Sequence, residues 1–138
     1  MASNYTENFG LCQWEATDQV LRTEFNEDNT KIDMALAAIP TLVAGTYVGN
    51  GSASQTISLG FTPKAVFFSP CDGKTYVSVS SGYIWGGLVI FGSPLKIDTT
   101  SAASIITGGF VVFQKSISNY SGVYCNKSEQ TYYYIAFA

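Results

Sequence analysis

The chain has 138 residues, of which 46% are apolar and only 12% are charged, and its net charge is −3. This length corresponds to about one domain, and the apolar fraction is large enough for a hydrophobic core, so we do not expect a disordered protein. Residues 1–44 contain seven acids and two bases, whereas residues 45–138 contain three acids and five lysines. Because five scattered lysines are too few to follow a phosphate backbone, we expect no nucleic-acid partner.

Membrane insertion and export are not expected either. The apolar runs GGLVIFG and FVVF are far shorter than a spanning helix, and the first residues lack the basic start and apolar run of a signal peptide. Cys12, Cys71 and Cys125 are odd in number and widely spaced, without the spacing of a zinc site. We expect three free thiols; a Cys71–Cys125 disulfide is the alternative, because both residues lie near predicted strand ends.

A helix is predicted from Glu24 to Ile39. Thr23 is a suitable N-cap residue, Asp18 is a second one upstream, and acidic residues in the first turn interact favourably with the helix dipole. Pro40 ends the helix, because proline lacks an N–H donor and disfavours helical geometry in the residue before it. A helix of about 16 residues is marginal in water by itself, so it must bury an apolar face.

The apolar face of this helix is a narrow stripe. Phe25, Ile32 and Ile39 recur every seven residues, with Leu21 and Leu36 beside them, and Asp28 interrupts the stripe. The stripe can pack on the chain's own β-domain, or it can pack on other copies as a short coiled coil whose polar seam residue fixes the register. We expect the second, with these five apolar residues at the contact. Two heptads are too few to hold copies together alone, so the β-domains must add contacts.

The remaining residues predict strands and turns. The Asn50-Gly51 pair predicts a hairpin between two strands, and AVFFS is a short apolar run expected to be buried on both faces. Gly, Ser, Asn and Pro clusters separate the further runs, which are Thr75–Val79, Tyr83–Phe91, Ala103–Ile106, Phe110–Gln114 and Thr131–Phe137. We therefore expect a mainly β protein, with a short N-terminal helix followed by an antiparallel, jelly-roll-like β-sandwich. The predicted parts are a connector, 1–44, and a β-sandwich, 45–138.

The sequence contains few residues that could catalyse a reaction. The absence of histidine removes the commonest general base and metal ligand, and the β-domain offers only Asp72, Asp98 and Glu129 as carboxylates. A glycosidase would have to bring two of these together. We therefore expect no catalytic residue, no metal and no cofactor.

The aromatic residues, 14% of the chain, indicate binding instead. Tyr132, Tyr133 and Tyr134 must alternate between the two faces of one strand, so at least one hydroxyl meets solvent or another copy. Six phenylalanines lie in apolar runs and are expected in the core: Phe61, Phe67, Phe91, Phe110, Phe113 and Phe137. Other aromatics lie among Ser, Gly and Asn, where loops would expose them to a partner. These candidate binding residues are Tyr76, Tyr83, Trp85, Tyr120 and Tyr124.

Two segments of the sequence, one at the N-terminus and one in the β-domain, each resemble a known protein segment. YTENFGLCQWEATDQVLRTEFNEDNTKIDMALAAI resembles the N-terminal segment of many tail proteins from bacteriophages and prophages of Gram-positive gut bacteria. GTYVGNGSASQTISLGFTPKAVFF, with GGF at 108 and the closing YYYIAF, resembles the small β-sandwich at the C-terminal end of phage tail-fibre and receptor-binding proteins. Together the segments span nearly the whole chain, although no fibre shaft separates them.

The resemblance implies a virion protein, made in the bacterial cytoplasm, that assembles as a homotrimer. It implies attachment to other tail proteins through the N-terminal segment and binding of a host-surface glycan or protein at the end of the β-domain away from the helix. Two other functions stay open. The protein can be a purely structural tail component without receptor affinity, or a small glycan-degrading enzyme, since some tail-tip proteins degrade glycans.

Overall fold

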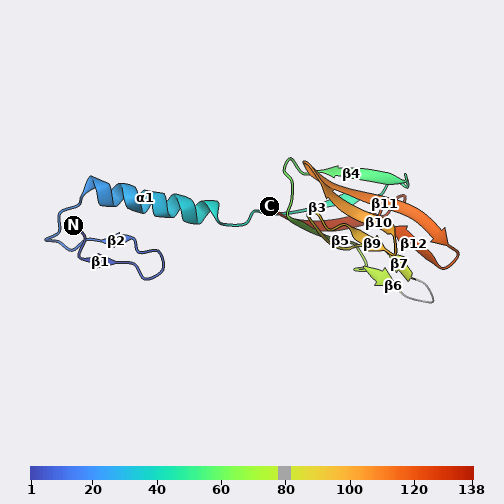
Figure 1. Ribbon diagram of the computed structural model, residues 1–138, viewed down its shortest axis with the longest axis horizontal. Helices are drawn as coiled ribbons and strands as arrows, with labels where there is room; N and C mark the ends of the chain where they lie inside the picture. Colours follow the sequence, from blue (N-terminus) through green and yellow to red (C-terminus); the bar gives the residue numbers. More distant parts are fainter. Residues whose placement is uncertain (78–81) are drawn as a thin grey trace. The chain divides into compact units, whose positions relative to one another are not determined.

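The computed structural model describes residues 1–77 and 82–138 (Figure 1). The chain divides into two compact units, an N-terminal unit, Met1–Pro40, and a β-unit, Thr41–Ala138. The division lies at Pro40, ahead of the predicted boundary after residue 44, because a strand already begins at Leu42. Two residues of the predicted strand Thr75–Val79, residues 78 and 79, lie outside the described residues.

The N-terminal unit contains a small hairpin and a helix. Strands β1 (Asn4–Tyr5) and β2 (Cys12–Gln13) pair antiparallel, and α1 spans Arg22–Ala37. The predicted Thr23 cap is wrong: Thr23 lies inside the helix, Leu21 occupies the N-cap position, and no side chain caps the helix there. Sequence preference for a cap is worth only about 1 kcal/mol, so tertiary contacts of the first turn can decide where the helix begins.

Tertiary contacts of α1 are made by two buried acids, Glu24 in the first turn and Asp28 in the second. Glu24 accepts hydrogen bonds from the backbone N–H of Ala2, at 3.0 and 3.2 Å, and from the indole of Trp14, at 3.3 Å. Asp28 accepts one from the backbone N–H of Cys12, at 2.7 Å, and pairs with Lys31 at 3.2 Å. The predicted role of Asp28 as a polar residue in a coiled-coil seam is therefore wrong, because its carboxylate holds the hairpin against the helix.

The N-terminal unit should lose stability at low pH. Burial opposes ionisation of Asp28, but hydrogen bonds from Cys12 and Lys31 outweigh this effect and hold the pKa of Asp28 below its usual value. A hydrogen bond from the Ser3 hydroxyl lowers the pKa of Asp18 in the same way. A lowered folded-state pKa stabilises the fold at pH values above the ordinary carboxyl pKa, and this contribution is lost as pH falls through the lower one. We expect Trp14 fluorescence, measured in a Trp85→Phe background, to report a transition beginning below about pH 4.

Asp28→Asn provides the control for this titration. The amide keeps one acceptor but removes the charge, so the variant should already be less stable at pH 7 and should vary less between pH 5 and pH 2. An acid transition of Trp14 that is the same in both proteins would contradict the assigned role of Asp28.

The β-unit consists of two sheets (Figure 1). The four-stranded sheet has the order β3-β13-β5-β8, with β3 Leu42–Val48, β13 Thr131–Phe137, β5 Ala65–Pro70 and β8 Gly87–Ile90. The seven-stranded sheet has the order β6-β7-β12-β11-β10-β9, and β4 pairs with β11 beside this path. Its strands are β4 Ser54–Ser58, β6 Tyr76–Val77, β7 Gly82–Ile84, β9 Leu95–Ile97, β10 Thr100–Ile106, β11 Gly109–Ser118 and β12 Ser121–Tyr124.

Inward-facing residues of both sheets form one hydrophobic core. Phe68 and Tyr132 from the four-stranded sheet and Phe110 from the seven-stranded sheet are fully buried in it. The ring of Phe110 lies 6.1 Å from that of Phe68 and 6.1 Å from that of Tyr47. The predicted β-sandwich-like fold with one N-terminal helix is thus confirmed, and it includes one parallel pair, β7 with β12. Among the described residues, no helix is long and apolar enough to cross a membrane.

The predicted Asn50-Gly51 hairpin is wrong. The strands on either side of it enter different sheets, since β3 pairs with β13 and β4 pairs with β11. The buried side chain of Asn126 holds this connection: it accepts a hydrogen bond from Asn50 N–H at 3.0 Å and donates to Asn50 Oδ1 at 2.7 Å and to the Ser52 carbonyl at 2.9 Å. A distant amide therefore replaces the partner that a hairpin strand would supply.

Two further expectations about the strands also fail. The run Tyr83–Phe91 forms no continuous strand, because it breaks after Ile84 and enters two different sheets as β7 and β8. The run AVFFS is not buried on both faces, since Phe67 is exposed. Of the six phenylalanines predicted in the core, Phe110 is buried in it, and Phe61 and Phe113 are partly buried against the core. Phe67, Phe91 and Phe137 are exposed.

Candidate functional site

The predicted binding residues lie mostly on strands rather than loops. Tyr76 is in β6, Tyr83 in β7 and Tyr124 in β12, whereas Trp85 directly follows β7 and Tyr120 occupies the turn between β11 and β12. Figure 1 shows β11 and β12 extending toward the end of the β-unit opposite to the C-terminus. The pairing of β7 with β12 places Gly122 beside Tyr83 and Val123 beside Ile84. This register brings three of the five residues onto one surface.

Tyr83, Tyr124 and Trp85 form what we call the aromatic cluster. The rings of Trp85 and Tyr124 stack with centroids 4.9 Å apart and planes inclined by 25°, and the Tyr83 ring lies 5.6 Å from that of Tyr124. Ile84 and Val123, the strand neighbours of these residues, point into the core, so the cluster lies on the outer face of the sheet. All three residues are half-buried. Contact between the rings leaves part of each ring open to solvent.

Two lysines lie over the indole of the aromatic cluster. The Lys127 ammonium is 5.4 Å from the centre of the Trp85 ring and that of Lys74 is 6.0 Å from it, within the range of cation–π attraction. Asp72 pairs with Lys74 at 2.8 Å, and its hydrogen bonds with Lys74 lower the pKa of the Asp72 carboxyl. Sequence reasoning missed both lysines, because nothing in their local sequence indicates contact with a tryptophan.

Buried tyrosines position the aromatic cluster from below. The Tyr132 hydroxyl donates a hydrogen bond to the carbonyl of Tyr124 and accepts one from the N–H of Lys127 at 3.2 Å; burial raises the pKa of Tyr132 to about 12. The ring of Tyr47 stacks on that of Tyr132 at 4.8 Å, and its hydroxyl donates to the carbonyl of Cys125 at 2.7 Å. The core therefore fixes the backbone that carries Tyr124 and Lys127.

The other two predicted residues are not part of the aromatic cluster. Tyr76 is the direct partner of Ile84 in the β6–β7 pair, so its side chain lies on the opposite face from Tyr83 and Trp85. Its ring lies against Gly82, where a Cβ would overlap it. Tyr120 is strongly exposed, and its carbonyl accepts a hydrogen bond from Gly82 N–H at 3.3 Å. The tyrosines of β13 alternate as predicted: Tyr132 is buried and Tyr133 exposed.

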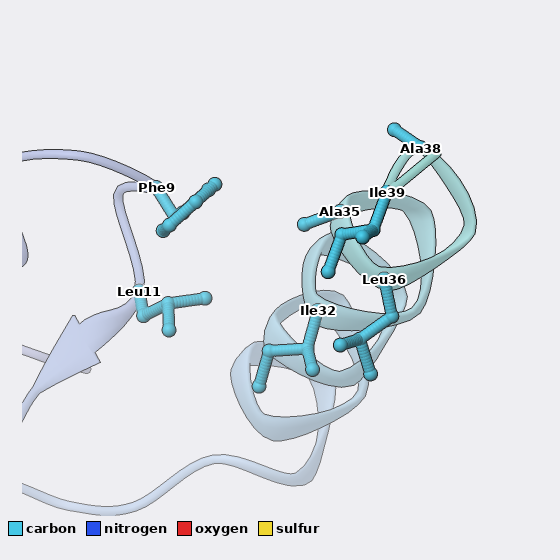
Figure 2. Close-up of a pocket in the computed structure, with 7 residues that line it drawn as sticks. All are labelled: Phe9, Leu11, Ile32, Ala35, Leu36, Ala38 and Ile39. Carbon is cyan, nitrogen blue, oxygen red and sulfur yellow. The ribbon is translucent and has the colours of Figure 1, made fainter. Parts of the chain in front are cut away.

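Of the five predicted oligomerisation residues, Phe25, Ile32 and Leu36 lie in α1, Leu21 is its N-cap residue and Ile39 follows its C-terminal end. Leu21 is half-buried, whereas Phe25, Ile32, Leu36 and Ile39 are exposed in this single chain. Figure 2 shows Phe9 and Leu11, from the loop of the hairpin, facing the helix across an apolar groove of about 450 Å³. On the helix side the groove is lined by Ile32, Ala35, Leu36, Ala38 and Ile39. The stripe therefore forms one wall of a groove as well as an exposed ridge.

The cysteines and carboxylates of the chain are the side chains that could bind a metal ion or form a disulfide. The described part of the chain holds no group of three or more Cys, Asp or Glu side chains arranged to bind a metal ion. Cys12, Cys71 and Cys125 are free thiols, and burial raises the pKa of Cys125. Of the three carboxylates of the β-unit, Asp72 pairs with Lys74, and Asp98 and Glu129 lie at backbone positions with positive φ, as residues in tight turns do.

Comparisons of the chain with protein-family models, with curated proteins and with solved structures found no match.

Proposed function

We propose that this protein is a non-enzymatic tail protein of a phage or prophage that binds a host-surface ligand through its β-unit. The observation that carries the binding role is the aromatic cluster with Lys74 and Lys127 over the Trp85 ring. Aromatic faces stack on the C–H surfaces of sugars, and hydroxyl and indole groups hydrogen-bond to sugar hydroxyls. Ammonium groups beside them attract carboxylates or phosphates.

The ligand that best fits this chemistry is a surface glycan carrying acidic groups. A weak site for one such group gains strength when several copies of the chain bind a repetitive surface together. The N-terminal unit supplies the proposed connection: its exposed stripe and apolar groove join copies of the chain, three in the proposed particle, or other tail proteins. A surface protein is the second candidate ligand.

One observation favours a purely structural role as the alternative. The Tyr83 hydroxyl donates a hydrogen bond to the carbonyl of Asn119 at 3.1 Å, and the Tyr124 ring contacts the rings of both Tyr83 and Trp85. These contacts stabilise the short parallel pair β7–β12 whether or not a ligand binds. A variant that removes only the exposed lysines of the site, Lys74 and Lys127, distinguishes a binding role from a structural one, because exposed side chains contribute little to stability.

The test compares attachment of purified variants to whole host cells and to immobilised surface glycans. In the binding role, Lys74→Ala with Lys127→Ala should weaken attachment about tenfold or more, and added salt should weaken attachment of the wild type. Lys64→Ala with Lys96→Ala removes two exposed lysines ahead of β5 and within β9 and serves as the matched control. Unchanged attachment of the Lys74/Lys127 variant would leave the structural role.

Trp85→Ala should reduce attachment further, because it removes the largest ring of the aromatic cluster. Since Trp85 is half-buried, we also expect its loss to cost about 1–2 kcal/mol of stability and to lower Tm by several degrees. The experiment is therefore run well below the Tm of the variant. If Trp85→Ala unfolds the β-unit but leaves the folded fraction fully competent to attach, the ring is structural and the ligand binds elsewhere.

A further inference from the structure

The outer face of the four-stranded sheet is an apolar surface of the β-unit that its own core does not use. Strand register places its side chains in rows: Phe137 lies between Leu42 and Ala65, and Ile135 lies between Ala44 and Phe67. Ile90 and Leu88 extend the two rows on β8. Tyr133 continues the face on β13, next to Ser69. We call this surface the outer β-face.

The outer β-face carries no charge. Strands β3, β13, β5 and β8 contain no Lys, Arg, Asp or Glu. All eight charged residues of the β-unit lie outside these four strands. Antiparallel sheets with one face on the core usually place polar side chains on the other. Here most of the alternate positions are apolar as well, with Thr46, Ser69 and Thr131 as the polar exceptions, which favours a sheet that is covered on both faces.

The size of the outer β-face matches a protein–protein contact. Its seven large side chains are between 37% and 57% exposed: Leu42, Phe67, Leu88, Ile90, Tyr133, Ile135 and Phe137. Since a large side chain offers about 150–250 Å², these leave roughly 700 Å² open. A specific interface buries about 800 Å² on each partner, and the largest apolar patch of a typical monomer is about 300–600 Å².

We propose that the outer β-face is the contact between copies of this chain, packed around the symmetry axis of the particle. A face without charge repels no identical face, and the charged side chains of the β-unit lie outside it, where they can stay in water. Large side chains lie beside small ones, with Phe137 next to Ala65 and Ile135 next to Ala44, and a hollow of about 110 Å³ opens between Phe67, Tyr133 and Ile135. The hollow has the size of an aliphatic side chain, such as Leu88 of another copy.

This inference rests on the proposed function only in requiring an oligomer, and it assigns the main contact to the β-unit rather than to α1. The helix stripe is short, and two heptads hold copies together weakly. The outer β-face supplies the additional apolar contact that such a particle requires.

The test is the mass of the full-length chain in solution by light scattering across a concentration series. The wild type should give about three times the chain mass of 14.9 kDa. Phe67→Lys with Ile135→Lys should give a monomer with an unchanged circular dichroism spectrum, because both positions are exposed in the single chain. Thr56→Lys, at an exposed position of β4 in the other sheet, is the matched control and should remain an oligomer.

Two further variants keep the result interpretable. Phe67→Ala adds no charge and should raise the dissociation constant about tenfold or more, which decides the question if the lysine variant does not fold. Ile32→Glu with Leu36→Glu changes the helix stripe instead, and should weaken the particle less than the change at Phe67.

An oligomer that keeps its mass and dissociation constant in both Phe67 variants would overturn the inference while leaving the proposed oligomer and its binding role intact. Dissociation by the helix variant alone would overturn it as well. A monomeric wild type would refute both this inference and the proposed trimer, and the outer β-face would then belong to a different partner. Ligand binding is tested separately, by comparing attachment of the Lys74→Ala, Lys127→Ala variant with that of the wild type.

Discussion

Phe110→Ala should lower the free energy of unfolding of the β-unit by about 3–5 kcal/mol, the range found when a buried phenylalanine is truncated. Phe110 is fully buried, and its ring lies 6.1 Å from Phe68 and 5.5 Å from Tyr134. These neighbours belong to the four-stranded sheet, whereas Phe110 belongs to the other. The substitution therefore leaves a cavity between the two sheets, which neither sheet can close without losing its own pairing.

Phe113→Ala, on the same strand, is the matched control. Phe113 is only half-buried and packs at the margin of the core, so its truncation should cost about 1–2 kcal/mol. Both variants and the wild type are unfolded with urea at one chain concentration, because association would make the apparent stability depend on concentration. Equal losses for the two variants would show that Phe110 is not the central contact between the sheets.

Gly109→Ala should cost about 3 kcal/mol or more, the upper range for inserting atoms into a packed position. Gly109 begins β11 and is paired on both sides, with Ser58 of β4 and Ile106 of β10. A Cβ at this position would overlap the carbonyl oxygen of Ile57. Since the obstacle is backbone, strand β4 itself would have to move away, and its pairing with β11 would weaken.

The neighbouring Gly108→Ala separates this overlap from a backbone effect. Gly108 has a φ of +82°, which side chains rarely adopt, but a Cβ there would have nothing within 4 Å. Its replacement should cost only the conformational penalty of about 1–2 kcal/mol. Urea unfolding measures both losses, and the far-ultraviolet circular dichroism spectrum reports whether β4 stays paired. A larger loss at Gly108 than at Gly109 would contradict the close approach of β4.

The class of fold follows from local sequence patterns, and so does the presence of a helical part ahead of a β-part. Alternating apolar residues and turn clusters predicted a β-sandwich after one helix, and Pro40 marked the end of the helical region within three residues of Ala37. These features depend on local periodicity and on the backbone chemistry of proline and glycine, which act over a few residues. Aromatic residues among Ser, Gly and Asn also predicted five candidate binding residues, of which Tyr83, Trp85 and Tyr124 meet in space and Tyr76 and Tyr120 do not.

Which residues become partners depends on contacts between distant parts of the chain. Asn50-Gly51 has the local chemistry of a hairpin, yet the chain crosses between sheets there because Asn126 supplies the hydrogen bonds from 76 residues away. Lys127 lies over Trp85 because β7 and β12, whose paired residues are 39 positions apart, pair in parallel. Asp28 turns toward the hairpin because Cys12 presents an N–H to it. Phe67 lies in an apolar run like that of Phe68, but a strand alternates its side chains, so burial of one face exposes the other. Which face meets the core depends on the pairing of distant strands, and local sequence does not contain that information.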